Sequence, residues 1–181
     1  MSRIRRPALM AGLVLTSFAI AACAPPAPPA MPSLGQGVLR VGSEISPGVY
    51  SSPADGHADY AARLDGNQDI ISNQYADRVL IEVKPTDTYV ELDGAFVGYQ
   101  PRPITPPPAG GIDVDGTWVV NTEVTPGTYR LLPTDGSAYW ARLGDANGDN
   151  ILANDYQNGQ TYITVQPGDF AVELSGRLMP A

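Results

Sequence analysis

The chain has 181 residues, 43% of them hydrophobic, and a formal net charge of −8 from 11 basic and 19 acidic residues. This acidic balance argues against nucleic acid or an anionic lipid surface as a partner, because both would repel it. The hydrophobic content is sufficient for a folded core and excludes an intrinsically disordered chain.

The first segment, residues 1–22, is predicted to be an export leader. Three arginines among its first six residues precede an apolar stretch over residues 8–22, which is too short for a comfortable transmembrane helix. The stretch leads into Ile20-Ala21-Ala22-Cys23, which resembles the lipobox of bacterial lipoproteins. The resemblance implies that Cys23 is diacylated and becomes the mature N-terminus. An ordinary signal peptide followed by a free thiol is the alternative.

Acylation of Cys23 would anchor the exported protein to the outer face of the cell membrane, or to an outer membrane where the cell has one. The leader carries three positive charges and no negative one, so its removal takes the net charge from −8 to −11. We therefore expect acyl chains, and not charge, to hold the protein at the bilayer.

Two proline-rich segments divide the rest of the chain. Residues 23–35 follow the lipobox and favour an extended polyproline II spacer behind the anchor. Residues 99–114 form a second Pro/Gly-rich linker, which separates β-repeat 1 (residues 36–98) from β-repeat 2 (residues 115–179). A peptide ligand for a proline-recognition domain is the sharper alternative for either segment.

The two repeats are copies of one another at a spacing of about eighty residues, which indicates a duplication. The matching pairs are 41–50 with 120–129, 60–64 with 139–143, 81–85 with 163–167, and 90–92 with 172–174. Within a repeat, apolar residues alternate with polar ones, as in Val90-Glu91-Leu92, a period typical of strands with one buried face.

The predicted fold class is all-β, with two small tandem antiparallel β-sandwich or barrel-like domains of five or six short strands each. Pro47-Gly48 and Pro126-Gly127 fit type II turns, and Asn158-Gly159 fits a hairpin turn. Because units this small bury a modest share of their surface, we expect them to pack against each other or against a partner.

The motifs Val-Gly-x-Glu-Ile-x-Pro-Gly-x-Tyr at residues 41–50 and Tyr-Trp-Ala-Arg at residues 139–142 resemble a largely uncharacterised family of exported β-repeats of high-GC bacteria. The resemblance implies a fold and an exported compartment, but no reaction. It also implies that the family's usual disulfide is absent here, because its cysteine positions hold Asp59 or Ala138, and Gly94 or Gly176.

Two Asp-rich segments offer alternating oxygen ligands, as the start of a calcium loop does. The candidate metal ligands are Asp65, Asn67, Asp69, Asp145, Asn147 and Asp149. Both segments lack the glycine and the glutamate that complete an EF-hand loop. A plain turn between strands, for which Asp, Asn and Gly are preferred, is the other interpretation.

Trp140 and Arg142 are two residues apart on a predicted strand and therefore face the same side. They are the candidate ligand-binding residues, because an exposed indole beside a guanidinium could stack on a sugar ring or a peptide. The alternative is that the indole covers the sheet in a cation–π contact with the guanidinium. Trp118 is expected in the core.

His57 is the only histidine, so neither a His-based metal site nor a His-activated nucleophile can be assembled. We therefore expect a non-enzymatic lipoprotein of the cell envelope with a binding or scaffold role, no catalytic residue and no cofactor other than the calcium considered above. Its partners would be the membrane, through acyl chains, and an envelope protein or glycan. The alternatives are a carbohydrate- or calcium-dependent binding module and a carboxylate-based hydrolase.

Overall fold

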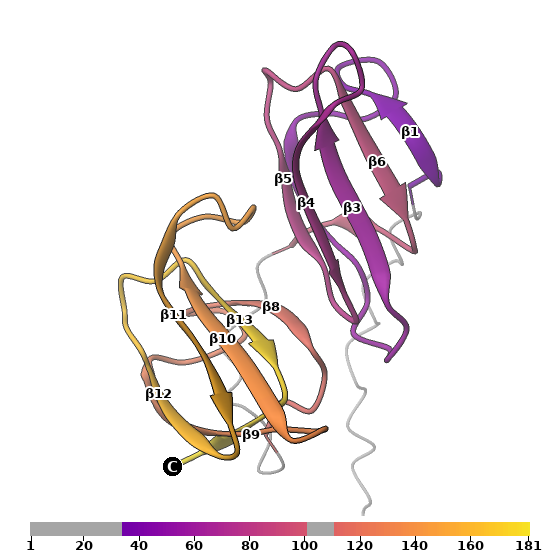
Figure 1. The fold of residues 1–181 in the computed structure, drawn as a ribbon. Coiled ribbons are helices and arrows are strands. Elements are labelled where there is room, and N and C mark those ends of the chain that lie inside the picture. The colour runs from indigo at the N-terminus through magenta and orange to yellow at the C-terminus, as the bar shows by residue number, and fades with distance from the viewer. Residues whose placement is uncertain (1–33, 101–110) are drawn as a thin grey trace, which may run out of the picture. The chain divides into compact units, whose positions relative to one another are not determined.

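The structure is a computed structural model that describes residues 34–100 and 111–181 (Figure 1). The leader, Cys23 and residues 101–110 of the linker lie outside the described residues. All helices and strands assigned in the two described ranges are β-strands. These ranges contain no helix that could cross a bilayer.

Repeat 1 consists of seven strands in two antiparallel sheets. The four-stranded sheet has the order β1-β6-β3-β4, and the three-stranded sheet has the order β5-β2-β7. The strands are β1 (Gly37–Arg40), β2 (Gly48–Ser51), β3 (Asp59–Leu64), β4 (Ile70–Ala76), β5 (Leu80–Val83), β6 (Tyr89–Asp93) and β7 (Val97–Gly98).

Repeat 2 has the same plan, with sheets β11-β10-β13-β8 and β12-β9-β14. Its strands are β8 (Gly116–Val119), β9 (Gly127–Leu132), β10 (Ser137–Leu143), β11 (Ile151–Asn158), β12 (Thr161–Val165), β13 (Ala171–Ser175) and β14 (Arg177–Pro180). Figure 1 shows β10 lying between β11 and β13, and β3 between β4 and β6.

The all-β prediction is confirmed, with seven strands in each repeat instead of five or six. The additional strand in each copy is the last one, β7 or β14, which returns to pair with β2 or β9. β7 has only two residues, too few for an alternating pattern to reveal it.

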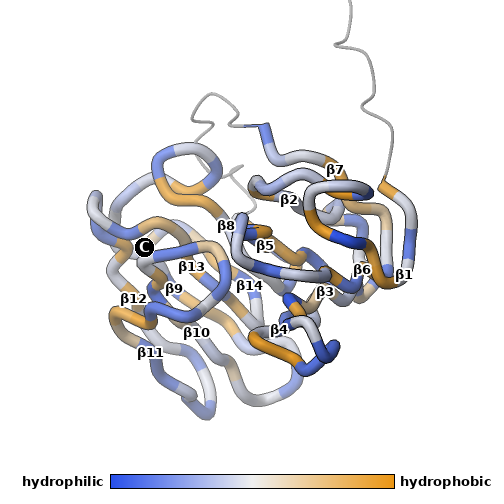
Figure 2. Tube along the Cα trace, turned by 90° about the horizontal axis from the view of Figure 1, so that it is seen from above, coloured by the Kyte–Doolittle hydropathy of each residue, from blue (hydrophilic) through white to orange (hydrophobic). Residues whose placement is uncertain are grey.

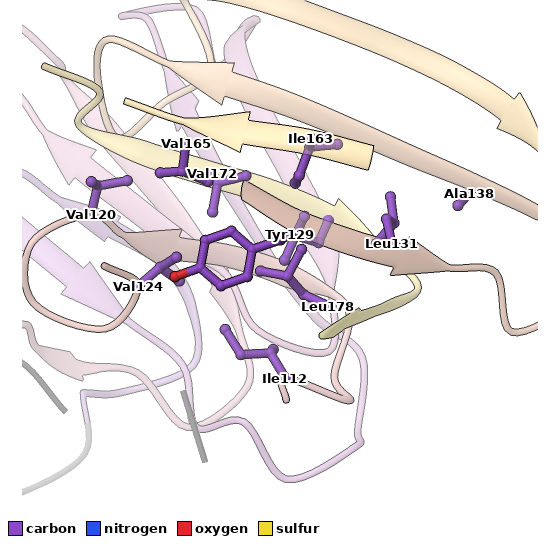
Figure 3. Packing of buried hydrophobic residues seen from close by; sticks show 11 residues of the cluster. Ile112, Val120, Val124, Tyr129, Leu131, Ala138, Ile163, Val165, Val172 and Leu178 are labelled. Atoms are coloured by element: carbon purple, nitrogen blue, oxygen red, sulfur yellow. The ribbon is translucent and has the colours of Figure 1, made fainter. Parts of the chain in front are cut away.

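Each repeat has its own hydrophobic core between its two sheets. In β6, Val90 and Leu92 are fully buried while Asp93 is exposed, and in β13 Val172 and Leu174 are buried, as the alternation predicts. Figure 3 shows Tyr129 of β9 among the apolar side chains of the repeat 2 core, with its hydroxyl at the edge, where it donates to the carbonyl of Thr125 at 2.6 Å.

Two turn predictions are wrong. Gly48 has φ 156°, close to extended, and Gly127 is not among the positive-φ glycines, so both Pro-Gly pairs lead into strands and are not type II turns. The Asn158-Gly159 turn does not close a hairpin, because β11 pairs with β10 whereas β12 pairs with β9 in the other sheet. The chain crosses between sheets there.

The positions of the family's cysteines do lie side by side. A Cβ atom added at Gly94 would overlap the carboxylate of Asp59, and one added at Gly176 would lie 3.5 Å from Cβ of Ala138. Both glycines have positive φ, at 138° and 126°, which disfavours a side chain at either place. Each repeat therefore has a pair of neighbouring residues in place of the disulfide, Asp59 with Gly94 in repeat 1 and Ala138 with Gly176 in repeat 2.

Candidate functional site

The two Asp-rich segments form Asx turns that connect β3 to β4 and β10 to β11. Asp65 Oδ1 accepts hydrogen bonds from the backbone N–H groups of Asn67 at 2.8 Å and Asp69 at 2.9 Å. Asp145 Oδ1 does the same for Asn147 and Asp149, at 3.0 and 3.1 Å. One oxygen of the first carboxylate is thus used within each turn, the geometry of the plain-turn interpretation.

These turns do not gather a set of acidic ligands. Within residues 34–100 and 111–181, no three His, Cys, Asp or Glu side chains are placed to hold a metal ion. A calcium ion at either turn would have to recruit backbone and amide oxygens in place of carboxylates.

The turn of repeat 2 instead docks on repeat 1 through Asn147, which is 5% exposed. The Asn147 side chain accepts a hydrogen bond from the N–H of Glu82 at 2.9 Å and donates one to the Glu82 carbonyl at 3.1 Å. Glu82 lies on β5, an edge strand, so the amide supplies the pair of bonds that a neighbouring strand would supply. The expected packing of the two repeats against each other is observed in these bonds between Asn147 and Glu82.

Asp149 completes this contact through charge. Its carboxylate lies 3.0 Å from Nη1 of Arg63 and 3.2 Å from Nζ of Lys84. Arg63 is itself almost fully buried and holds Asp87 through Nε at 2.8 Å and Nη2 at 2.9 Å. The hydrogen bond from Arg63 to Asp87 raises the pKa of the guanidinium.

Arg142 is the counterpart of Arg63 in repeat 2. It binds Asp169 through Nε and Nη2, both at 2.7 Å. Burial by itself would raise the pKa of Asp169, but the hydrogen bonds from Arg142 and from the N–H of Gln166 outweigh burial, and the pKa is lowered. Nη1 takes no part in these two bonds.

The predicted partners Trp140 and Arg142 are not brought together as a stacking platform. Trp140 packs against the core of repeat 2, and its indole N–H is buried. The cation–π contact found among the described residues is elsewhere: the guanidinium carbon of Arg78 lies 4.7 Å from the ring centroid of Trp118. Trp118 is partly buried against the same core, close to its expected place.

Arg78 is a second junction between the repeats that sequence reasoning missed. Its side chain is 6% exposed, donates to the carbonyl of Thr117 and forms an ion pair with Glu123 at 2.7 Å. Its backbone N–H donates to Asp115, and its carbonyl accepts from Thr117. An open pocket of about 380 Å³ lies beside it, but the pocket's charged pair, Arg78 and Glu123, is already engaged.

Two strand edges present apolar side chains at matching positions of the duplication. β4 and β11 are outer strands of the two four-stranded sheets. Ile70 of β4 pairs with Leu64, and Ile151 of β11 pairs with Leu143. The exposed fractions are 58% for Ile70, 48% for Ile71, 72% for Tyr75, 50% for Ile151, 46% for Leu152 and 64% for Tyr156. Figure 2 shows the hydrophobic start of β4 at the surface. Natural edge strands are usually protected by charge or proline, and exposed apolar residues on such strands are typical of interaction surfaces.

Glu173 alternates with the buried Val172 and Leu174 of β13, yet it is itself partly buried. It lines a pocket of about 250 Å³ together with Tyr139, Tyr75 and Asp115, and burial raises the pKa of its carboxyl group. Asp115 is engaged, because it accepts the N–H of Gly176 at 2.7 Å. The alternation of β13 could not reveal this burial, since the covering residues come from other elements.

Replacement of Glu173 with glutamine is expected to stabilise the protein at pH 7, because burial opposes the ionised carboxylate. A carboxyl group whose pKa is raised on folding stabilises the fold at low pH and loses that contribution as pH rises through the folded pKa. The difference between parent and Glu173→Gln should therefore vanish below pH ~4. Urea unfolding at several pH values measures this, with Glu91→Gln at the equivalent place in repeat 1 as control. A stabilisation that persists unchanged at low pH would contradict the explanation.

The fold and these contacts define a duplicated all-β protein, whose repeats are joined through a docked turn and whose two outer strands carry exposed apolar residues. Residues 110–176, most of repeat 2, match the family model described as the Rv1352-like extracellular domain. The similarity indicates an extracellular domain and hence export, in agreement with the predicted leader. No curated protein and no solved structure matches the chain.

Proposed function

We propose that the protein is a lipid-anchored, non-enzymatic scaffold of the cell envelope that binds an extended segment of another envelope protein along the edges of β4 and β11. The observation that carries this proposal is the duplicated row of exposed Ile, Leu and Tyr side chains on two outer strands. An outer strand offers unpaired backbone groups, and an added strand would satisfy them while covering the apolar side chains.

The match of residues 110–176 to an extracellular domain supports an exported location for this surface. Anchoring at Cys23, followed by a proline-rich spacer, would hold both edges at a short distance from the bilayer. The acidic net charge favours a partner other than the lipid surface itself.

Photocrosslinking in intact cells tests the proposal. A photoreactive residue in place of Tyr75 or Tyr156 is expected to yield the same protein adduct, whereas one in place of the exposed Asp93 should not. Ile71→Lys or Leu152→Lys should reduce the adduct about tenfold, because each places an unpaired charge in the contact. Adducts from all three sites alike, or an adduct removed by glycosidase and not by protease, would contradict a protein partner.

The anchor is tested in the same cells by Cys23→Ala. This variant is expected to appear in the medium or to remain as an uncleaved precursor, because it cannot be acylated. Its adduct with the partner should then fall, since the tether raises the local concentration. Unchanged membrane association would contradict acylation at Cys23.

A further inference from the structure

The two Asp-rich turns have the same internal geometry but different surroundings. In the turn of repeat 2, Ala146 and Asn147 are buried against repeat 1. In the turn of repeat 1, residues 66–69 are all exposed. The turn of residues 65–69 therefore has no surface within the described part of the chain on which it docks.

The surface equivalent to the occupied one also exists, on β12 of repeat 2. β5 and β12 are both edge strands and pair in the same register with β2 and β9, so Glu82 corresponds to Thr164 and Leu80 to Tyr162. Leu80 is fully buried, in contact with Val119 and Ala146 of repeat 2. Tyr162 is 60% exposed.

The polar groups of the open turn and the open edge match those of the occupied contact. Asn67 corresponds to Asn147, because each follows the first Asp of its turn by two residues and donates its N–H to that carboxylate. The N–H and C=O of Glu82 point away from β2 and toward Asn147. Thr164 has the same register on β9, so its N–H and C=O point toward the open side of β12. An incoming Asn67 amide would therefore find one donor and one acceptor.

The charged groups match as well. In the occupied contact, Asp149 binds Nη1 of Arg63, whose Nε and Nη2 hold Asp87. In repeat 2, Arg142 holds Asp169 through the same two atoms, which leaves Nη1 directed away from that pair. Asp69 is the exposed equivalent of Asp149, so its carboxylate is the natural ligand of Arg142 Nη1.

From these four correspondences we infer that copies of this chain associate head to tail, with the turn of residues 65–69 in one copy bound to the β12 edge and Arg142 of the next. Each repeat would then dock its turn on the following repeat, first within a chain and then between chains. The contact joins two different surfaces, so it extends a chain of copies or closes a ring. The contact borders the β4 and β11 edges, because the turn precedes Ile70 of β4 and Asp155 lies on β11. It uses the turn, the β12 edge and Arg142, and it does not rest on the proposed function.

Several substitutions, two of them in polar groups, make this contact weaker than the one inside the chain. Gln166 replaces Lys84, which removes a cation, and Asp155 replaces Gln74, which donates to the carbonyl of Ala146 at 2.8 Å. The turn of repeat 1 is also two residues shorter, but reach is no constraint between separate molecules. Tethering to one membrane would compensate for weak affinity by raising the effective concentration.

Cysteine cross-linking of the full chain in intact cells tests the inference. Asn67→Cys/Thr164→Cys, treated with a short bis-maleimide, is expected to give a ladder of dimers, trimers and larger species, because every copy carries both surfaces. Asn147→Cys/Glu82→Cys is the matched control and should link within one chain and stay in the monomer band. The parent chain, which has Cys23 alone, sets the baseline.

A second variant keeps the test specific. Asp69→Lys, added to the cross-linking pair, should reduce the ladder about tenfold by opposing Arg142. Asp69 is exposed and contributes only its backbone N–H and carbonyl to the turn, so the substitution leaves those bonds in place. A monomer band alone, dimers without larger species, or a ladder unaffected by Asp69→Lys would overturn the inference. The adducts at Tyr75 and Tyr156 should be unchanged by Asp69→Lys, which separates this result from the proposed function.

Discussion

Replacement of Arg78 with alanine is expected to lower the free energy of unfolding by about 3–5 kcal/mol. The side chain of Arg78 is 6% exposed and that of Glu123 is 12% exposed, so the variant leaves a carboxylate buried without its cation. It also removes the donor to the carbonyl of Thr117 and the cation over Trp118. Urea-induced unfolding of the purified protein measures the change.

Two comparisons isolate the cause of that loss. Arg177→Ala removes an exposed ion pair with Asp113 at 3.7 Å and should cost less than about 1 kcal/mol. The double variant Arg78→Met/Glu123→Leu should recover much of the stability, because neither charge is then left unpaired. A loss below about 1 kcal/mol for Arg78→Ala would show that water reaches Glu123 and that the junction is not tightly closed.

Replacement of Gly116 with alanine is expected to destabilise the protein by about 3–4 kcal/mol. Gly116 has φ 137°, and an added Cβ atom would overlap the carbonyl oxygen of Arg78, which bridges the two repeats at this point. Neither the backbone of Arg78 nor its buried side chain can yield without breaking the bonds to Asp115 and Thr117.

The duplication provides the matched control for Gly116. Gly37 occupies the same position in repeat 1, at the start of β1, with φ 101° and open space around the added Cβ atom. Gly37→Ala should therefore show only the backbone strain, about 1 kcal/mol. Equal losses in urea unfolding for the two variants would mean that the close approach to Arg78 contributes nothing.

The sequence predicted those features that depend on local chemistry and on the repeat. The period-two alternation identified the buried faces of β6 and β13, because one side of such a strand faces its own sheet's core. The Asp-rich segments were recognised as turn-formers, because the carboxylate bonds to N–H groups two and four residues ahead in the same segment.

The candidate sites depended on partners that come from distant parts of the chain. Three contacts join residues from different repeats: Leu80 with Val119 and Ala146, Asn147 with Glu82, and Arg78 with Glu123. Arg142 was singled out beside Trp140, yet its partner is Asp169, 27 residues further along the chain. Spacing along a strand shows which residues share a face, but not what covers that face.

The sequence by itself thus determined the duplication, the all-β class and the chemistry of the two Asp-rich turns, because periodicity and side-chain to backbone bonding act over a few residues. Only the tertiary structure decided which of the two equivalent turns is used. Asn147 is buried against β5, whereas Asn67 is exposed. Two nearly identical segments differ in role because a chain of two repeats can form only one turn-to-edge contact internally. The turn of repeat 1 and the β12 edge of repeat 2 are then left without a partner in the described part of the same chain.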